Sequence, residues 1–169
     1  MGAPRNLTDG TLTVKDGTGT PKQLAVVMDS GELDFEIMEP TKAPVHNRKE
    51  IVSVREGRKQ LHPVTFKCGF DFLQGDTAGS TPSLHEALKG YGLATSSGWV
   101  TVGTAASGSS YCTNIIFEIV SPAGVATEKA ETVTIGKFHL TSFKVVEGES
   151  QNNVEVKGLA ETITSARHS

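Results

Sequence analysis

The sequence predicts a mainly β protein, and three observations support this fold class. Apolar and polar residues alternate with a period of two along several segments, as in strands that bury one face. The chain has 18 glycines among its 169 residues and is rich in Thr and Ser, which favours strands and turns over helices. A chain of this length suits one domain, which we expect to span residues 1–169.

The clearest alternation lies in the segment GELDFEIMEP, which places apolar and acidic side chains on opposite faces of one strand. The apolar face carries Leu33, Phe35 and Ile37, and the acidic face carries Glu32, Asp34 and Glu36. The segment VTFKCGFDFL, residues 64–73, repeats the alternation as far as Phe72. It sets Cys68 among phenylalanines, so we expect a buried thiol there rather than a disulfide with Cys112.

The other expected strands are separated by turn sequences such as DGTGTP, SPAG and EGESQNN. They cover residues 11–15, 23–28, 50–55, 99–102, 114–120, 131–135, 138–146 and 153–157. Near the end of the chain the apolar parity switches across Gly136 and again before Phe143. An extra residue in a strand reverses the facing of everything after it, so these switches predict β-bulges.

One segment, TPSLHEALKGYG, breaks the period of two. Its apolar residues Leu84, Ala87 and Leu88 follow helical spacing, with a proline at the start and glycines at the end. The pattern predicts one short α-helix at about residues 81–91, docked by its apolar side against the sheets.

No pattern of catalytic or metal-binding residues stands out. The segment HEALK starts like the zinc motif H-E-x-x-H, but Lys89 stands where the second histidine is required. The histidines have no ligand spacing, and neither a phosphate loop nor a nucleophile elbow is present. Alternating carboxylates such as those at residues 32–36 are common on a solvated strand face. We therefore expect no enzyme activity, no metal and no cofactor.

Charge and hydropathy exclude two further classes. The formal net charge of −3 argues against a protein that coats nucleic acid, because such binding requires many Lys and Arg side chains. No apolar run approaches the roughly 18 residues that a membrane span needs, so we expect no membrane association. The N-terminal sequence shows no pattern of an export or lipidation signal.

Residues 46–62, HNRKEIVSVREGRKQLH, form a basic segment in this acidic chain. Five basic residues stand against two acidic ones, which gives +3 and leaves −6 for the remainder. The basic residues are Arg48, Lys49, Arg55, Arg58 and Lys59. With prolines on both sides, the sequence predicts a long protruding hairpin or loop at about residues 40–62. Such a hairpin is either a plain surface feature or an assembly arm that adds a strand to a neighbouring copy, its basic residues meeting an acidic surface.

The order of these features resembles the major tail tube proteins of long non-contractile-tailed bacteriophages over nearly the whole chain. The segments that carry the resemblance are GTLTVKDGTGTP, LDFEIME, RKEIVSVREGRKQ, VTFKCGFDF, TPSLHEALKG and KFHLTSFKVVEGESQNNVEVKGLAE. The resemblance implies a β-sandwich or barrel-like fold with one flanking helix, whose copies form six-membered rings stacked into a hollow tube. In such tubes strands of neighbouring subunits join into one inner barrel, and a long hairpin reaches the next subunit or ring.

The resemblance also implies partners and a location. The partners are further copies of the chain, the tape measure protein in the lumen, and the tail tip or initiator and tail terminator proteins. Genomic DNA passes through without specific binding. The location is the virion tail, assembled in the host bacterial cytoplasm. Glu32, Asp34 and Glu36 are candidates to line the lumen, since carboxylates repel the phosphates of sliding DNA.

Two other interpretations stay open. The tube protein of a type VI secretion or contractile injection system shares the same architecture and would give a nearly identical pattern. A non-polymerising capsid decoration protein or carbohydrate-binding β-sandwich is the second. Carbohydrate binders expose aromatic platforms, and beyond its phenylalanines this chain offers only Tyr91, Trp99 and Tyr111.

Overall fold

Strands dominate the structure, which confirms the predicted mainly β class. The computed structural model describes residues 10–17, 23–26, 33–69, 82–99, 112–119, 131–147 and 153–167. These ranges contain two short helices, α1 (Leu84–Lys89) and α2 (Leu93–Ser96), and nine strands. The strands are β1 (Gly10–Lys15), β2 (Gln23–Val26), β3 (Leu33–Phe35), β4 (Lys42–Asn47), β5 (Glu50–Glu56), β6 (His62–Gly69), β7 (Cys112–Ile119), β8 (Glu131–Val146) and β9 (Asn153–Arg167).

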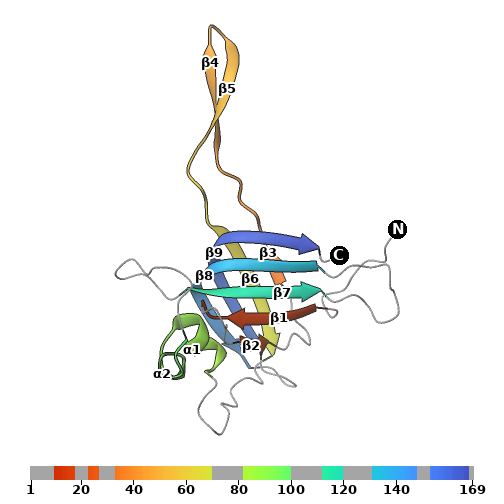
Figure 1. The fold of residues 1–169 in the computed structure, drawn as a ribbon, viewed down its shortest axis with the longest axis vertical. Coiled ribbons are helices and arrows are strands. Elements are labelled where there is room, and N and C mark those ends of the chain that lie inside the picture. Colours follow the sequence, from red (N-terminus) through yellow and green to blue (C-terminus); the bar gives the residue numbers. More distant parts are fainter. Residues whose placement is uncertain are drawn as a thin grey trace, which may run out of the picture.

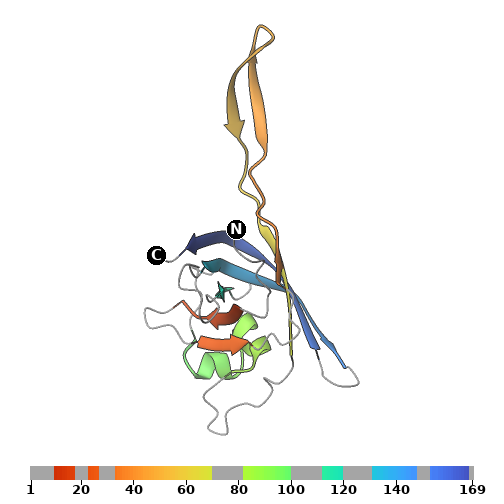
Figure 2. The same cartoon turned by 90° about the vertical axis from the view of Figure 1, so that its right-hand side faces the viewer.

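Seven strands form one antiparallel sheet in the order β2-β1-β7-β8-β9-β6-β3, and β4 and β5 form a separate hairpin. Two strands of the sheet are far longer than the rest, since β8 has 16 residues and β9 has 15. They stay paired from Glu131 opposite Arg167 to Val146 opposite Asn153. The long pair bends, so the sheet folds over itself (Figures 1 and 2).

The fold therefore has two layers made from one sheet. The first layer contains β1, β2 and β7 with the N-terminal half of β8 and the C-terminal half of β9 (Figure 1). The second layer contains β3 and β6 with the other halves of the two long strands. The β-sandwich that the resemblance implied is thus made by bending, with β8 and β9 belonging to both layers.

Bulges occur where the sequence predicted them. The register between β7 and β8 shifts beside Asn114, opposite Gly136 and Lys137. Lys137 has a φ of 52°, and its N–H donates to the Asn114 side-chain oxygen at 3.2 Å. A second shift lies between Leu140 and Ser142, before Phe143. The two strands predicted at 131–135 and 138–146 are therefore one strand that bends at its bulges.

The core lies between the two layers. Phe66 and Phe138 are fully buried, with ring centroids 6.4 Å apart. Around them pack buried residues of the first layer (Leu12, Val14, Ile115, Val133, Ile135) and of the second layer (Val64, Cys68, Val154, Val156, Ala160). Cys68 is the buried, free thiol that the sequence predicted, and its burial raises the pKa of the thiol to about 11.

The helices cover one end of this core. α1 contacts β7 and β8 and buries Leu84, Ala87 and Leu88, the apolar positions found in the sequence. Ser83 and Glu86 form a capping box at its start, and Gly90 ends it with a φ of 66°. The predicted single helix is followed by α2, a four-residue turn of helix that the sequence did not predict.

Several other expectations differ from the structure or lie outside the described residues. β4 was not predicted as a strand, and β9 continues to Arg167 rather than ending at 157. Trp99 is buried but lies outside any strand, and 100–102 are not among the described residues. β6 ends at Gly69, so the predicted continuation to 72 is also outside them.

Replacing Thr113 with valine should stabilise the protein. The Thr113 hydroxyl is buried and has no hydrogen-bond partner among the residues that the structure describes. Valine has nearly the same shape and removes the cost of an unsatisfied polar group, so the free energy of unfolding should rise by about 1 kcal/mol. Urea denaturation measures the change, with Thr164→Val on the exposed part of β9 as the control. A loss of stability in Thr113→Val would show that the hydroxyl is hydrogen-bonded.

Replacing Gly158 with alanine should destabilise the fold. A methyl group at this position in β9 would overlap the Phe138 ring and the His139 carbonyl oxygen, neither of which can move without disturbing the core. Overpacking of this kind costs roughly 1–3 kcal/mol. Gly136→Ala is the matched control, because its added methyl meets mainly the end of the Thr162 side chain, which can rotate away. Equal thermal unfolding of the two variants would contradict the expectation.

Candidate assembly surfaces

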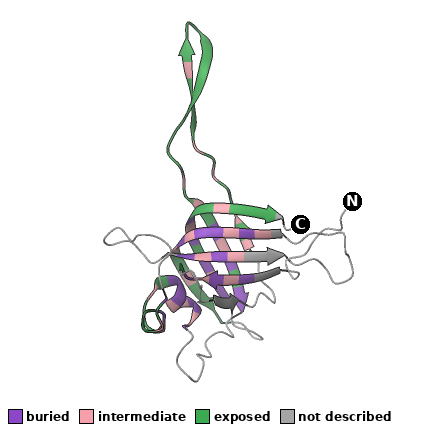
Figure 3. Ribbon diagram, in the orientation of Figure 1, coloured by how far each residue is buried: buried purple, intermediate pink, exposed green. Residues whose placement is uncertain are grey.

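The β4–β5 hairpin projects away from the sheet, as the sequence predicted for residues 40–62 (Figures 1 and 3). Its strands pair from Lys42 opposite Glu56 to Asn47 opposite Glu50. Arg48 and Lys49 make the connecting turn, with φ values of 47° and 74°. Positive φ at both positions suits the right-handed twist of a two-residue hairpin turn, although Asn and Gly are the usual residues there. We call residues 40–62 the arm.

One face of the arm is apolar and exposed. The register shifts by one residue beside Val45, which leaves a bulge at Val52. Residues opposite one another in a ladder share a face, so Pro44 lies with Val54, and His46 with Ile51. The bulge thereby keeps Ile51 on the side of Val54. These side chains contact no core, since Ile51 is 63% exposed, Val52 64% and Val54 55%.

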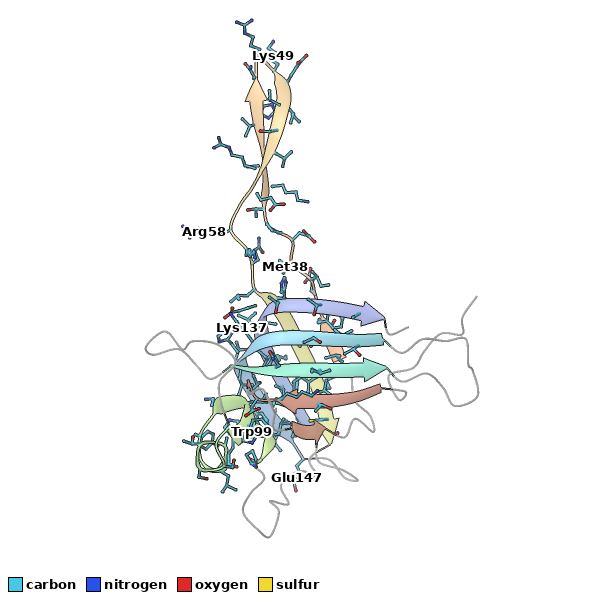
Figure 4. The ribbon with its side chains drawn as sticks, in the orientation of Figure 1. Met38, Lys49, Arg58, Trp99, Lys137 and Glu147 are labelled. Carbon is cyan, nitrogen blue, oxygen red and sulfur yellow. The ribbon has the colours of Figure 1, made fainter. Side chains whose placement is uncertain are left out.

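Two irregular segments, residues 36–41 and 57–61, connect the β4–β5 hairpin to the second layer, and we call them the legs. The N–H of Gly57 donates to the Thr41 carbonyl at 2.6 Å and so joins the two legs below the hairpin. Nearer the sheet, the Met38 N–H donates to Nδ1 of His62 at 2.9 Å. Figure 4 places Met38 at the foot of the arm and Lys49 at its tip. These two hydrogen bonds join the legs to one another and to the start of β6.

A groove lies at this base, between the legs and the C-terminal half of β9. Its volume is about 280 Å³, and its walls include Ile37, Met38, Lys59 and the segment 161–164. Among the described strands β6 stops pairing at His62, opposite Ala160, so β9 beyond that point pairs only with β8. The groove therefore borders an open strand edge.

Glu161, in the wall of this groove, is held by two basic side chains. The Lys137 ammonium lies 3.0 Å from one of its oxygens, and His139 Nε2 lies 3.1 Å from the other. The hydrogen bond from Lys137, and then that from His139, lower the pKa of the Glu161 carboxyl. The contacts tie the bend of β8 to β9.

The five basic residues named from the sequence do not form one patch. Arg48 and Lys49 occupy the tip of the arm, and Arg55 lies in β5 opposite Ala43. Arg58 and Lys59 belong to the leg that returns to the sheet, and Figure 4 shows Arg58 well below Lys49. All five are exposed. The arm therefore carries positive charge along its whole length.

Two residues of the acidic stripe predicted at 32–36, Asp34 and Glu36, lie on or just beyond the face of the second layer that is turned away from the core, which we call the outer face. Asp34 is exposed there, while Leu33 and Phe35 pack against the core. Glu36 is exposed just beyond the strand, and its N–H donates to the Pro63 carbonyl at 3.1 Å. Glu32 is outside the described residues.

Lysines share the outer face with these carboxylates. The alternation in the sequence predicted the carboxylates but not the lysines. Cross-strand pairing sets Lys67 beside Glu155, and Glu155 beside Lys144. Lys157 lies 3.1 Å from Glu155. This hydrogen bond from Lys157 is the main cause of the lowered pKa of Glu155, with smaller effects of Lys67 and Lys144. These residues are far apart in the sequence, so only the strand order reveals that they are neighbours.

The second layer ends in two open edges. Among the described strands β3 pairs only with β6, and β8 from Leu140 to Val146 pairs only with β9. Val145 and Val146 are 47% and 44% exposed at the end of the β8 edge. Unpaired edges with apolar side chains are templates for strand addition, and proteins normally cover or use them.

The described residues contain no group of three or more His, Cys, Asp or Glu side chains arranged to hold a metal ion. None of the helices in the described ranges is long and apolar enough to cross a membrane. The features that stand out are the arm, the groove at its base and the two open edges.

Comparison with known proteins identifies solved structures of similar fold. No protein-family model matches the chain, and no curated protein sequence does either. Among solved structures, the chain is similar to the sheath/tube terminator of the PVC extracellular contractile injection system, with a TM-score of 0.56 and 12% identity over 98% of both chains.

Two more structures show the same likeness. The PVC sheath-tube complex gives a TM-score of 0.55 at 11% identity, covering 98% of this chain and 93% of the other. The tube terminating cap of the anti-feeding prophage gives 0.56 at 14% identity, covering 99% and 94%. At such low identity the likeness establishes the fold alone: the chain has the fold of tube and terminator components of phage-tail-like contractile injection systems.

Proposed function

We propose that the chain is a structural subunit that polymerises as stacked rings into the hollow tube of a phage-tail-like particle. The observation that carries this proposal is the arm, a separate strand ladder whose apolar side chains Ile51, Val52 and Val54 are each more than half exposed. A hairpin of two strands is marginal alone, so an arm of this kind gains stability from a partner. The fold likeness to tube and terminator proteins supports the same role.

Two kinds of particle fit this proposal. The order of sequence features favours the tail of a long non-contractile-tailed phage, with six-membered rings. The structural neighbours favour a contractile injection system, in which the chain would be a tube or terminator subunit. Gene order separates the two: a neighbouring gene for a sheath protein indicates the contractile particle, whereas a very long tape measure gene without a sheath gene indicates the phage tail.

In the phage tail, the tube would enclose the tape measure protein, meet the tail tip and terminator proteins at its ends, and conduct DNA during ejection. We propose that the outer face lines the bore, with Asp34, Glu36 and Glu32 among the lining residues. Asp34 and Glu36 are exposed on or beside this face. Lys67, Lys144 and Lys157 accompany them, so the lining would be mixed in charge. Such a surface offers no continuous positive track for phosphates to bind.

Electron microscopy of the concentrated purified protein tests the proposal. Regular tubes or stacked rings of uniform diameter are expected, and their diameter and symmetry give the number of subunits per ring. Stacking is head-to-tail and does not close, so growth should continue along one axis. Single rings that never stack would indicate a terminator. A protein that stays monomeric at every concentration would contradict the proposed function.

Reversing two charges on the arm, Arg48→Glu with Arg55→Glu, should block polymerisation and leave the monomer folded. Both side chains are exposed and lie outside the core, so their loss does not affect folding. Charge reversal at a subunit contact opposes association with an acidic neighbouring surface. Circular dichroism checks the fold, and electron microscopy with sedimentation checks assembly.

The matched control is Arg48→Lys with Arg55→Lys, which keeps both charges and should still form tubes. Normal tubes from the doubly reversed variant would show that the charge of the arm plays no part in assembly. A third variant, Ile51→Ser with Val54→Ser, tests the apolar face separately and should also weaken assembly.

A further inference from the structure

We infer that His62 is a pH-sensitive switch at the foot of the arm: its neutral ring holds the leg 36–41 to the sheet, and its protonated ring releases that leg. The switch is a property of the single chain. Its effect on tube formation rests on the proposed function, because only an assembling copy needs its hairpin to point in one direction.

The ladder between β3 and β6 ends where this leg begins. The last pair is Phe35 opposite Val64, and one more backbone bond follows, from the Glu36 N–H to the Pro63 carbonyl at 3.1 Å. Pro63 has no N–H, so it cannot return a hydrogen bond to Glu36. The regular pairing therefore cannot continue along the leg in the usual pattern.

The side chain of His62 takes over at this point. The Met38 N–H donates to Nδ1 of His62 at 2.9 Å, an ordinary length for a hydrogen bond. A regular continuation of the ladder would set Met38 opposite Leu61, since Phe35 is opposite Val64. The imidazole thus accepts the hydrogen bond that a backbone carbonyl of β6 would accept in a longer ladder. We call this Met38–His62 bond the latch, and Figure 4 shows Met38 at the foot of the arm.

The latch exists in only one protonation state of the ring. A backbone N–H can only donate, so Nδ1 of His62 is an unprotonated acceptor and the hydrogen of the neutral ring is on Nε2. In a charged imidazole both nitrogens carry a hydrogen, and Nδ1 would then present an N–H to the N–H of Met38. Protonation therefore removes the latch completely. Histidine is the side chain whose charge ordinarily changes between about pH 5 and 8.

The groove that contains the half-buried ring of His62 carries charges of both signs. The charged groups that line it are Glu39 from the leg 36–41, Lys59 from the leg 57–61, and Glu161 from β9, whose carboxylate is held by Lys137 and His139 of β8. A protonated ring can therefore stay in the groove beside carboxylates. What changes is the hydrogen bond to the leg.

The position of the latch makes one hydrogen bond important. The bond from the Gly57 N–H to the Thr41 carbonyl joins the two legs to one another rather than to the sheet. The latch joins the leg to β6 at Met38, between Glu36 and Thr41. Its loss gives the leg, and the hairpin above it, more freedom of direction. A neighbouring copy that receives the hairpin must then offset more ordering entropy.

Amide hydrogen exchange tests the latch on the single chain, below any concentration at which it assembles. The protection factor of the Met38 amide, which corrects for the effect of pH on intrinsic exchange, should fall about fivefold between about pH 7.5 and pH 5. In His62→Asn the side-chain oxygen replaces Nδ1 as an acceptor that does not titrate, so protection should be the same at both pH values. In His62→Lys no acceptor remains, so protection should be low at both.

The nitrogen chemical shifts of the wild-type ring give a second readout that needs no variant. The neutral ring should carry its hydrogen on Nε2, and its protonation should follow the same pH curve as the loss of Met38 protection. A hydrogen on Nδ1 of the neutral ring overturns the inference. So does Met38 protection that stays constant while the ring is protonated.

His139→Gln is the matched control, since it removes another titrating histidine beside the groove and keeps a donor for Glu161. Its Met38 amide should lose protection at acidic pH like that of the wild type. Constant protection in this variant would assign the pH response to His139 and overturn the inference. Circular dichroism should show native folding for every variant.

The pH dependence of assembly tests the consequence. The wild type should need at least about three times more protein to form tubes at about pH 5 than at about pH 7.5, and His62→Asn should show a smaller difference. Sedimentation measures the protein that assembles. An equal pH effect in the wild type and His62→Asn overturns the role of the latch in assembly. A wild-type chain that never assembles overturns the proposed function, whereas the exchange experiment still decides whether the latch exists.

Discussion

The pairing of β8 with β9 is the constraint on which the rest of the fold depends. It is the longest ladder in the described structure, running from Glu131 opposite Arg167 to Val146 opposite Asn153. Since both strands pass through both layers, this ladder alone connects the part of the sheet that carries β1, β2 and β7 to the part that carries β3, β6 and the arm. The bulge at Gly136–Lys137 and the Lys137–Glu161–His139 contacts lie in this ladder, where the strands bend. The arm is therefore positioned by a bend far from it in sequence.

The outer face shows how a sheet can be strongly charged without having one sign. Lys67, Lys144 and Lys157 come from three strands and lie around Glu155, with Asp34 and Glu36 at the side. Each exposed ion pair contributes little to stability by itself, because water screens it. Their arrangement matters more for what the face repels or accepts, since a mixed surface neither holds a polyanion nor excludes one over a long range.

The sequence predicted the elements whose apolar residues repeat regularly, and missed those that lack such a repeat. The alternation around Leu33 and Phe66, and the helical spacing of Leu84, Ala87 and Leu88, correspond to β3, β6 and α1. The parity switches at Gly136 and before Phe143 located both bulges in β8. β4 was missed because KAPVHN contains a proline and no alternation, and the end of β9 because ETITSAR has a single large apolar residue.

The candidate surfaces were predictable to a similar degree. The arm and the acidic stripe are contiguous segments, so composition and periodicity were enough to find them. The lysines of the outer face, the open β8 edge and the groove beside β9 combine residues from distant segments. No local pattern records which strands are neighbours, and a seven-stranded order with the hairpin inserted between β3 and β6 is one of many possibilities.

The arm adds a thermodynamic consequence of its own. Its strands β4 and β5 have almost entirely exposed side chains, so its hydrogen bonds are open to water and its backbone order is opposed by conformational entropy. The free energy that keeps the arm ordered is therefore smaller than that of the domain core. A partner that captures the arm must therefore offset this ordering entropy. Association would then be accompanied by a larger decrease in heat capacity than the docking of rigid surfaces of the same area.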